Sequence, residues 1–124
     1  MEAPHPSIHV VRPSGRQYEP DPHAEGSEIH RLHADAPYAH LLRLSPGTTV
    51  DLHSHTANEL MAVLEGTVTV GGVSCESGSV VTIPAGARYD LVVGDERTVV
   101  LVVRPHHGAA ADPPAASGQK GATS

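Results

Sequence analysis

The sequence contains no phenylalanine and no tryptophan, and it has only three tyrosines and two methionines. Any hydrophobic core must therefore be built almost entirely from aliphatic side chains. Valine is abundant and often paired, as at Val80-Val81, Val92-Val93 and Val99-Val100. Because valine is branched at Cβ, it packs well on the pleated surface of a sheet. The composition therefore favours β-structure.

Positive charge is also scarce. The 124 residues include 8 Lys or Arg and 14 Asp or Glu, for a formal net charge of −6 with histidines neutral. No cluster of Lys or Arg is present, and the binding of nucleic acid or of an anionic membrane surface depends on such clusters. We therefore expect neither of these partners.

Cys75 is the single cysteine, so an intramolecular disulfide is impossible. A chain with a free cysteine fits a reducing compartment. The sequence also has no signal-peptide h-region and no apolar run long enough to span a membrane. Together these absences predict a cytoplasmic protein.

The length fits one small domain with mobile ends. Residues 1–7 and 105–124 are rich in Pro, Ala, Gly and Ser and have almost nothing to bury, so we expect both to be flexible tails. Residues 8–104 would then form the folded unit.

Short β-type segments separated by turn residues dominate this unit. Many short strands without helical periodicity predict an all-β sandwich or barrel. The predicted strands cover residues 8–11, 27–33, 39–44, 50–55, 60–65, 67–70, 80–83, 88–93 and 98–103.

The stretch from Gly47 to Gly66 carries the clearest chemical signal. His53 and His55 are two positions apart, and alternate residues of a strand share a face, so both rings should point the same way. Glu59 keeps this parity across a short turn and can complete the set from the next strand. Two imidazoles and a carboxylate suit iron, zinc, copper or nickel.

These residues resemble the first motif of the cupin superfamily, in which Gly47, His53, His55, Glu59 and Gly66 fill every fixed position. The second cupin motif is similar to residues 78–93, where its glycine-proline-glycine frame is complete. The resemblance implies a jelly-roll double-stranded β-barrel with a divalent transition metal ion (Fe, Zn, Ni, Cu or Mn). It also places Tyr89 where cupins carry the third metal-binding histidine.

Tyr89 is therefore the residue on which function depends. A phenol has a reference pKa about 3.5 units above that of imidazole, so it is a poorer ligand near neutral pH unless the metal lowers that pKa. Three roles are open: a phenolate ligand, a hydrogen-bonding or proton-transferring group beside a metal held by three ligands, and a packing residue in a barrel without metal.

Other residues are candidates for the pocket wall. Alternation from Glu59 predicts that Met61 and Val63 line the pocket. His40 either enters it, as a fourth ligand or a general base, or lies on the surface, which we favour. Arg43 and Arg88 could anchor a substrate carboxylate through their guanidinium forks, although solvated positions are the simpler expectation. The remaining histidines of interest, for which adventitious metal binding is the expectation, are His23, His30, His33, His106 and His107.

The resemblance implies a metal-binding cupin that acts on an oxygen-rich small metabolite. His53, His55, Glu59 and Tyr89 would form the metal site, with Glu59 and Tyr89 as catalytic candidates. Cupin enzymes include dioxygenases, isomerases, lyases and cyclases, and the fold does not choose among them. Resemblance and the need to cover sheet edges also predict a homodimer.

A second hypothesis is a sensor without catalysis. The segment from Glu28 to Gly47 resembles the entry to cupin sensor domains of the ChrR anti-sigma type, where a metal-bearing barrel reports a signal to a partner. Such sensors carry a helical partner-binding region, and the sequence predicts no helix of that kind.

Overall fold

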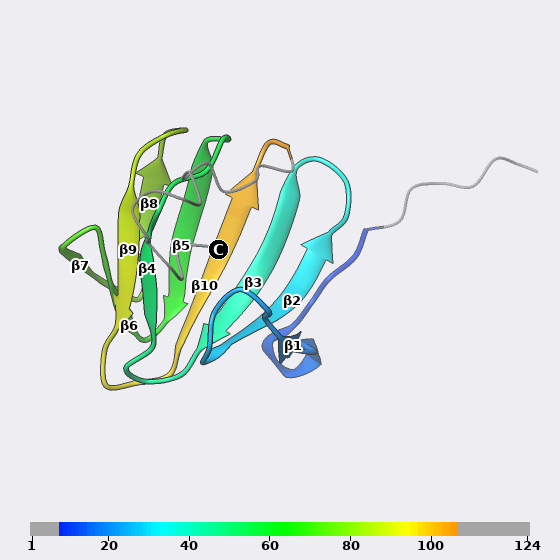
Figure 1. Cartoon of the computed structure of the whole chain (residues 1–124). Helices are drawn as coiled ribbons and strands as arrows, with labels where there is room; N and C mark the ends of the chain where they lie inside the picture. Colours follow the sequence, from blue (N-terminus) through cyan, green and yellow to red (C-terminus); the bar gives the residue numbers. More distant parts are fainter. Residues whose placement is uncertain (1–7, 107–124) are drawn as a thin grey trace, which may run out of the picture.

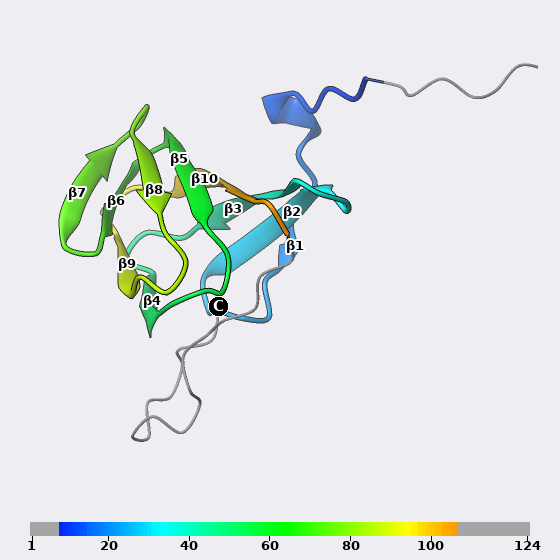
Figure 2. The ribbon, with the colours of Figure 1, turned by 90° about the horizontal axis from the view of Figure 1, so that it is seen from above.

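The computed structural model describes residues 8–106, which form two antiparallel sheets (Figure 1). The strand order is β1-β2-β3-β10-β5-β8 in the six-stranded sheet and β4-β9-β6-β7 in the four-stranded sheet. The elements are η1 (Pro13–Gly15), β1 (Glu19–Pro20), β2 (Ser27–His33), β3 (Tyr38–Leu44), β4 (Thr49–His53), β5 (Glu59–Glu65), β6 (Thr67–Val70), β7 (Val73–Glu76), β8 (Val80–Ile83), β9 (Tyr89–Val93) and β10 (Thr98–Arg104). The sheets face each other as two layers when seen from above (Figure 2). The predicted all-β fold is confirmed.

Alternate residues of both sheets fill the space between the layers. Val100 and Val102 of β10 are buried there, together with Val63 of β5 and with Leu91 and Val93 of β9. Tyr89 supplies the one aromatic ring that residues 8–106 contribute to this cluster. The core is therefore aliphatic, as the lack of Phe and Trp requires.

Most predicted strands are present within a residue or two of their expected bounds, and three differences are informative. Residues 8–11 are not a strand: Ile8 is 92% exposed and Val10 is 69% exposed, with no neighbouring strand to pair with. The hairpin strand β7 was not predicted, because only Cys75 of its four residues is buried. The strand predicted at residues 50–55 ends at His53, since its pairing with β9 shifts between Val50 and His53.

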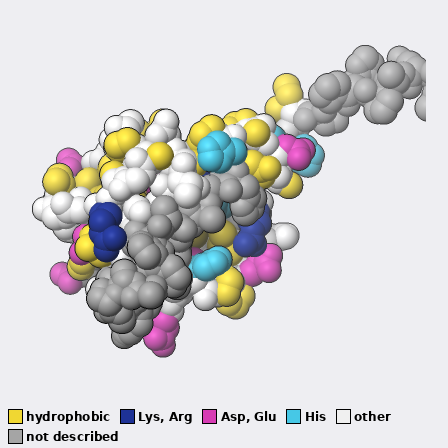
Figure 3. Space-filling model, turned by 45° about the horizontal axis from the view of Figure 1, so that its top comes forward, with side chains coloured by type: hydrophobic (Ala, Val, Ile, Leu, Met, Phe, Trp, Pro, Cys, Tyr) yellow, Lys and Arg dark blue, Asp and Glu magenta, His cyan; other side chains and the backbone are white. Residues whose placement is uncertain are grey.

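Some expectations concern parts of the chain that the structure does not describe. Residues 1–7 and 107–124, including His107, lie outside the described residues, and the expected homodimer stays a prediction. Between residues 8 and 106, no helix is long and apolar enough to cross a membrane. On the face shown in Figure 3, the visible Lys and Arg side chains are few and separated among the described residues.

Gly47 and Gly66, which bound the first motif, both adopt positive φ, at 76° and 80°. At Gly47 a Cβ would meet nothing within 4 Å. At Gly66 a Cβ would overlap Thr98 Oγ1 and would lie 2.8 Å from the carbonyl oxygen of Arg97 and 2.9 Å from Thr98 Cα. The two glycines therefore share a backbone requirement and differ in the space beside them.

We expect Gly47→Ala to lower the free energy of unfolding by about 1 to 2 kcal/mol, the cost of a left-handed alanine. Gly66→Ala should cost at least about 1 kcal/mol more, because strands β5 and β10 must also separate around the new methyl group. Denaturant unfolding of both variants measures the difference. Equal losses would show that the close approach to Thr98 costs nothing.

Candidate functional site

A cavity of about 530 Å³ opens between the two sheets. Its walls come from the beginnings of β3, β5 and β9 and from the ends of β2, β4 and β10, with residues 21–27 closing one side. Its middle is aliphatic and is lined by Ile29, Leu42, Val50, Met61, Leu91 and Val102. An apolar cavity with a few polar groups is typical of a small-molecule site.

The strand register brings the motif residues to one end of this cavity. His53, the last residue of β4, lies opposite Tyr89, the first residue of β9, and their ring centroids are 4.5 Å apart. Glu59 is the first residue of β5 on the facing sheet. All three side chains line the cavity and are buried.

The carboxylate of Glu59 is held from two sides. The Tyr89 hydroxyl donates a hydrogen bond to Oε1 at 2.7 Å, and Arg104 Nη2 donates to Oε2 at 3.1 Å. The Glu59 side chain is only 2% exposed, and that of Arg104 is 19% exposed. A buried carboxylate is costly without such partners, so these two contacts explain how Glu59 remains there as a charged group.

His55 follows β4 as an isolated bridge residue, and its carbonyl oxygen accepts a hydrogen bond from Gly86 N at 2.9 Å. Its ring packs edge-on against that of His53, with centroids 4.9 Å apart. Its Nε2 lies 3.4 Å from Arg104 Nη2. A guanidinium group has only donors, so this contact requires a lone pair on Nε2.

The tautomer of His53 follows from its neighbour in the chain. Its Nδ1 lies 2.7 Å from the carbonyl oxygen of Asp51, which can only accept a hydrogen bond. Nδ1 therefore carries a proton, which leaves Nε2 as the ring nitrogen that could bind a metal. Fixing one ring nitrogen on a carbonyl in this way is typical of histidines that bind metals.

Tyr89 is a neutral phenol in this setting. Burial, followed by the Glu59 carboxylate, raises the pKa of the Tyr89 hydroxyl well above its usual value. Its proton is used in the hydrogen bond to Glu59. In this arrangement Tyr89 acts as a hydrogen-bond donor.

The donor set fits a divalent transition metal ion by its chemistry, because His53 and Glu59 are buried in the cavity wall and the buried imidazole of His55 packs against His53. As the side chains stand, however, no three His, Cys, Asp or Glu residues among residues 8–106 are grouped closely enough to hold an ion. Arg104 Nη2 contacts two of the three candidate ligands, Glu59 Oε2 and His55 Nε2.

His40 faces the cavity, contrary to the surface position that we favoured from the sequence. It lies opposite Val102 in the pairing of β3 with β10, so it shares the inner face with a core residue. Burial, followed by the charge of Arg104, lowers the pKa of His40 to about 4. The imidazole is therefore neutral near pH 7.

The predicted carboxylate anchors are elsewhere. Arg43 pairs with Glu28 at 2.7 Å and lies over the Tyr18 ring, while Arg88 is exposed, and neither lines the cavity. Met61 lines the cavity as predicted, whereas Val63 packs in the core deeper between the sheets. Of the additional histidines, His23, His33 and His106 line the cavity, and His30 instead contacts Tyr18 and Gln17.

Sequence reasoning missed Arg104 and Arg31. Arg104 lies two residues beyond Val102, so alternation would have placed it inside had the strand been extended past residue 103. Arg31 lies two residues beyond the buried Ile29 on β2. The available signal was therefore the same parity rule that located Glu59.

The family comparison is clear. The model of the ChrR cupin-like domain matches residues 7–109. None of the curated proteins matches the sequence.

Several solved structures share the fold. The polyketide cyclase RemF from Streptomyces resistomycificus is 22% identical, with a TM-score of 0.71 and coverage of 82% of both chains. KdgF from Halomonas sp. is 15% identical, with a TM-score of 0.67 and coverage of 82% of this chain and 96% of that one.

A chain from the complex of Rhodobacter sphaeroides SigE with the anti-sigma ChrR is 19% identical, with a TM-score of 0.67. The match covers 75% of this chain and 51% of that one, so the present chain spans about half the length of that relative. Likeness at these identities shows the fold alone. Since the family model spans most of the sequence, the chain belongs to the ChrR cupin-like domain family of the cupin superfamily.

Proposed function

We propose that the chain binds one divalent transition metal ion through His53, His55 and Glu59 and acts as an enzyme on a small molecule in the adjoining cavity. The observation that carries this proposal is that His53 and Glu59 are buried in the wall of a cavity of about 530 Å³, with the buried ring of His55 packed against His53. Iron, zinc, nickel, copper and manganese all suit these ligands. When bound, the ion would supply a Lewis acid for an oxygen-bearing substrate or, as iron, the means to react with dioxygen.

The other residues of the site have distinct tasks in this proposal. Tyr89 orients Glu59 through its hydrogen bond and holds a proton at its hydroxyl oxygen. Arg104 neutralises Glu59 before the ion arrives. The aliphatic wall at Val50, Leu91 and Val102 excludes water and holds the carbon skeleton of the substrate.

A sensor function is the second candidate, and the match to the ChrR cupin-like domain favours it. In that case the same cavity would bind a signal molecule without turning it over. The one helical element among residues 8–106 is the short η1, so a partner-binding helix would have to lie elsewhere. Retention of an unmodified bound ligand, with a ligand-dependent change in the binding of a partner protein, would distinguish this function from catalysis.

Metal content gives the first test. Protein purified without a tag should contain close to one equivalent of a transition metal, and replacing His53 and His55 together with alanine should reduce this to background. The matched control replaces His9 and His30, which do not line the cavity, and should keep the ion. Elemental analysis of the three proteins decides the result. An unchanged metal content in the His53/His55 double variant would assign the ion to other histidines.

Tyr89→Phe tests the role of the phenol. We expect metal to remain bound with an affinity lowered by about 10-fold to 100-fold, because Tyr89 orients a ligand without being one. If a substrate is turned over, the rate should fall by a factor on the order of 100 to 10,000. The iron(III) form of the wild type should show no tyrosinate charge-transfer band. A visible band that disappears in Tyr89→Phe would make Tyr89 a ligand instead.

Arg104→Met tests whether the guanidinium competes with the ion. Arg104 lies against two of the proposed ligands, and its buried Nε has no hydrogen-bond partner among the described residues. Removing its charge should lower the thermal stability of the metal-free protein and should tighten zinc binding by about 10-fold. Isothermal titration with zinc measures this, with Arg12→Met as the control at an exposed site. Weaker zinc binding in Arg104→Met would show that Arg104 supports the ion and does not compete with it.

A further inference from the structure

We propose that Arg31 and His40 form an anion site within the cavity and that the natural ligand is an organic acid held there by its carboxylate. This inference rests on the proposed small-molecule function of the cavity and adds the class of ligand. It does not depend on the identity of the metal. Nor does it depend on whether the ligand is turned over or sensed.

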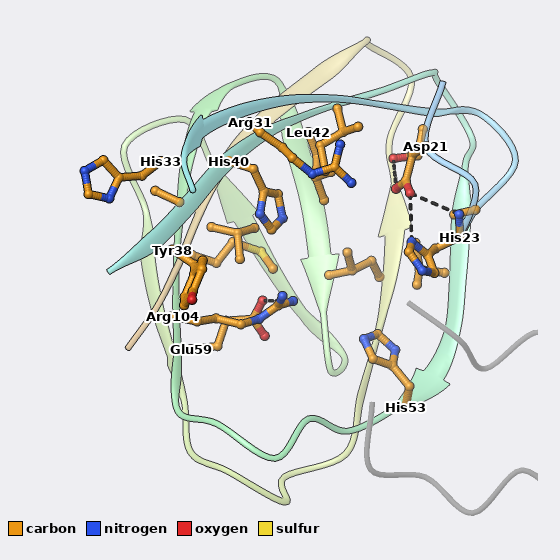
Figure 4. A pocket seen from close by; sticks show the side chains of 18 of the residues that line it. Asp21, His23, Arg31, His33, Tyr38, His40, Leu42, His53, Glu59 and Arg104 are labelled. Atoms are coloured by element: carbon orange, nitrogen blue, oxygen red, sulfur yellow. Dashed lines mark hydrogen bonds and ion pairs between the residues drawn. The ribbon is translucent and has the colours of Figure 1, made fainter. Parts of the chain in front are cut away.

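The strand register places the two side chains together. Arg31 of β2 lies directly opposite His40 of β3, and His40 lies opposite Val102 of β10. Residues directly opposite in an antiparallel pair share a face, with Cβ atoms about 5 Å apart. Figure 4 shows both side chains directed into the cavity, next to each other and facing the ion pair of Arg104 with Glu59.

Arg31 differs from three other arginines, whose side chains form ion pairs with glutamates. Arg16 is paired with Glu65, Arg43 with Glu28 and Arg104 with Glu59. Within residues 8–106 neither the Arg31 side chain nor the His40 side chain makes a hydrogen bond or ion pair. In a chain with a formal net charge of −6, a cation that faces the cavity and is not paired with a carboxylate is available to a ligand.

The acidic residue in the loop before β2 does not pair with Arg31. Asp21 also lines the cavity, and its side chain is only 6% exposed. Its carboxylate accepts hydrogen bonds from Ser27 Oγ at 2.9 Å and from the backbone N of His23 at 3.0 Å, and the His23 ring lies at 3.2 Å. The Asp21 carboxylate is thus hydrogen-bonded within the loop before β2, and it does not pair with the Arg31 guanidinium.

A carboxylate fits these donors better than a phosphate group. The guanidinium fork matches the two oxygens of a carboxylate. His40, whose pKa is lowered to about 4, adds one neutral N–H donor near pH 7 without a second positive charge. The pair therefore offers one net charge, which suits a monoanion. A phosphate monoester would bring nearly two negative charges.

The geometry also sets the size of the acid. Strands β2 and β5 are separated by β3 and β10, so Arg31 lies about 14 Å from Met61 at the backbone, and Glu59, two residues along β5, lies about 16 Å from Arg31. Their side chains shorten this gap, and Val102 and Met61 form the floor between them. The ligand is therefore an acid whose apolar skeleton crosses these two residues and carries a reactive or recognised group toward Glu59.

Binding of trans-cinnamate and of its neutral isostere cinnamamide to the full chain tests this inference. By isothermal titration and ligand-observed NMR, the wild type should bind cinnamate at least about 10-fold more tightly than the amide. Arg31→Met should remove this preference while leaving the affinity for the amide unchanged. Arg31→Lys should restore part of it, because lysine keeps the charge and loses the fork. Arg12→Met, at an exposed site outside the cavity, should behave as the wild type.

Several outcomes would overturn the proposal. They are equal binding of acid and amide to the wild type, no binding of cinnamate at all, tighter binding of phenyl phosphate, and a preference lost in Arg104→Met but kept in Arg31→Met. The metal content of the same preparations separates this proposal from the previous one. A metal-free protein that still selects the acid through Arg31 would refute the metal site alone, and a metal-loaded protein without this selectivity would refute the anion site alone.

Discussion

A buried carboxylate organises this end of the molecule. Moving Glu59 out of water as a charged group is unfavourable unless the interior returns a counterion and hydrogen bonds. The fold supplies both, from Arg104 at the end of β10 and from Tyr89 at the beginning of β9. Because β9 belongs to the other sheet, one side chain ties the two layers together where the core gives way to the cavity. The two histidines are arranged around these partners of Glu59: the ring of His53 lies against Tyr89, and His55 lies beside Arg104.

Strand register explains why chemistry gathers at one end of the barrel. On the inner face of the large sheet, Val102 pairs with His40 on one side and with Met61 on the other. The row two residues further along contains Arg104 and Glu59, whereas the row two residues back contains the fully buried Val100. Polarity therefore rises along each strand toward the cavity. A shift of one residue in any of these strands would turn its polar side chains outward.

Much of this site could be predicted from the sequence, because parity within a strand is a local property. The rule placed His53, His55 and Glu59 on one face, and it would have located Arg104 had β10 been extended by one residue. Tyr89 was assigned to the site by the cupin resemblance. The motif spacing also predicted that His55 lies beside His53, although strand β4 ends at His53. What local rules could not supply is the pairing between strands. The inner position of His40 depends on which face of β3 meets the second sheet, and that choice is made by packing across the whole domain.

The same limitation explains the misplaced carboxylate anchors. From the sequence nothing separates Arg43 from Arg31, since each is an arginine within a predicted strand and is followed by a leucine. The fold separates them, because Arg43 is on the outer face of β3 beside Glu28 and Tyr18, whereas Arg31 is on the inner face of β2 beside His40.

An outer arginine paired with a glutamate contributes little to stability, since water screens both charges. Arg31 lines the cavity but is also exposed, so water screens its charge as well. The two arginines differ in their partners, because Arg43 is paired with a glutamate and the Arg31 side chain has no carboxylate partner among residues 8–106. The strand pairing, and not the number or spacing of the arginines, therefore decides which of them faces the cavity.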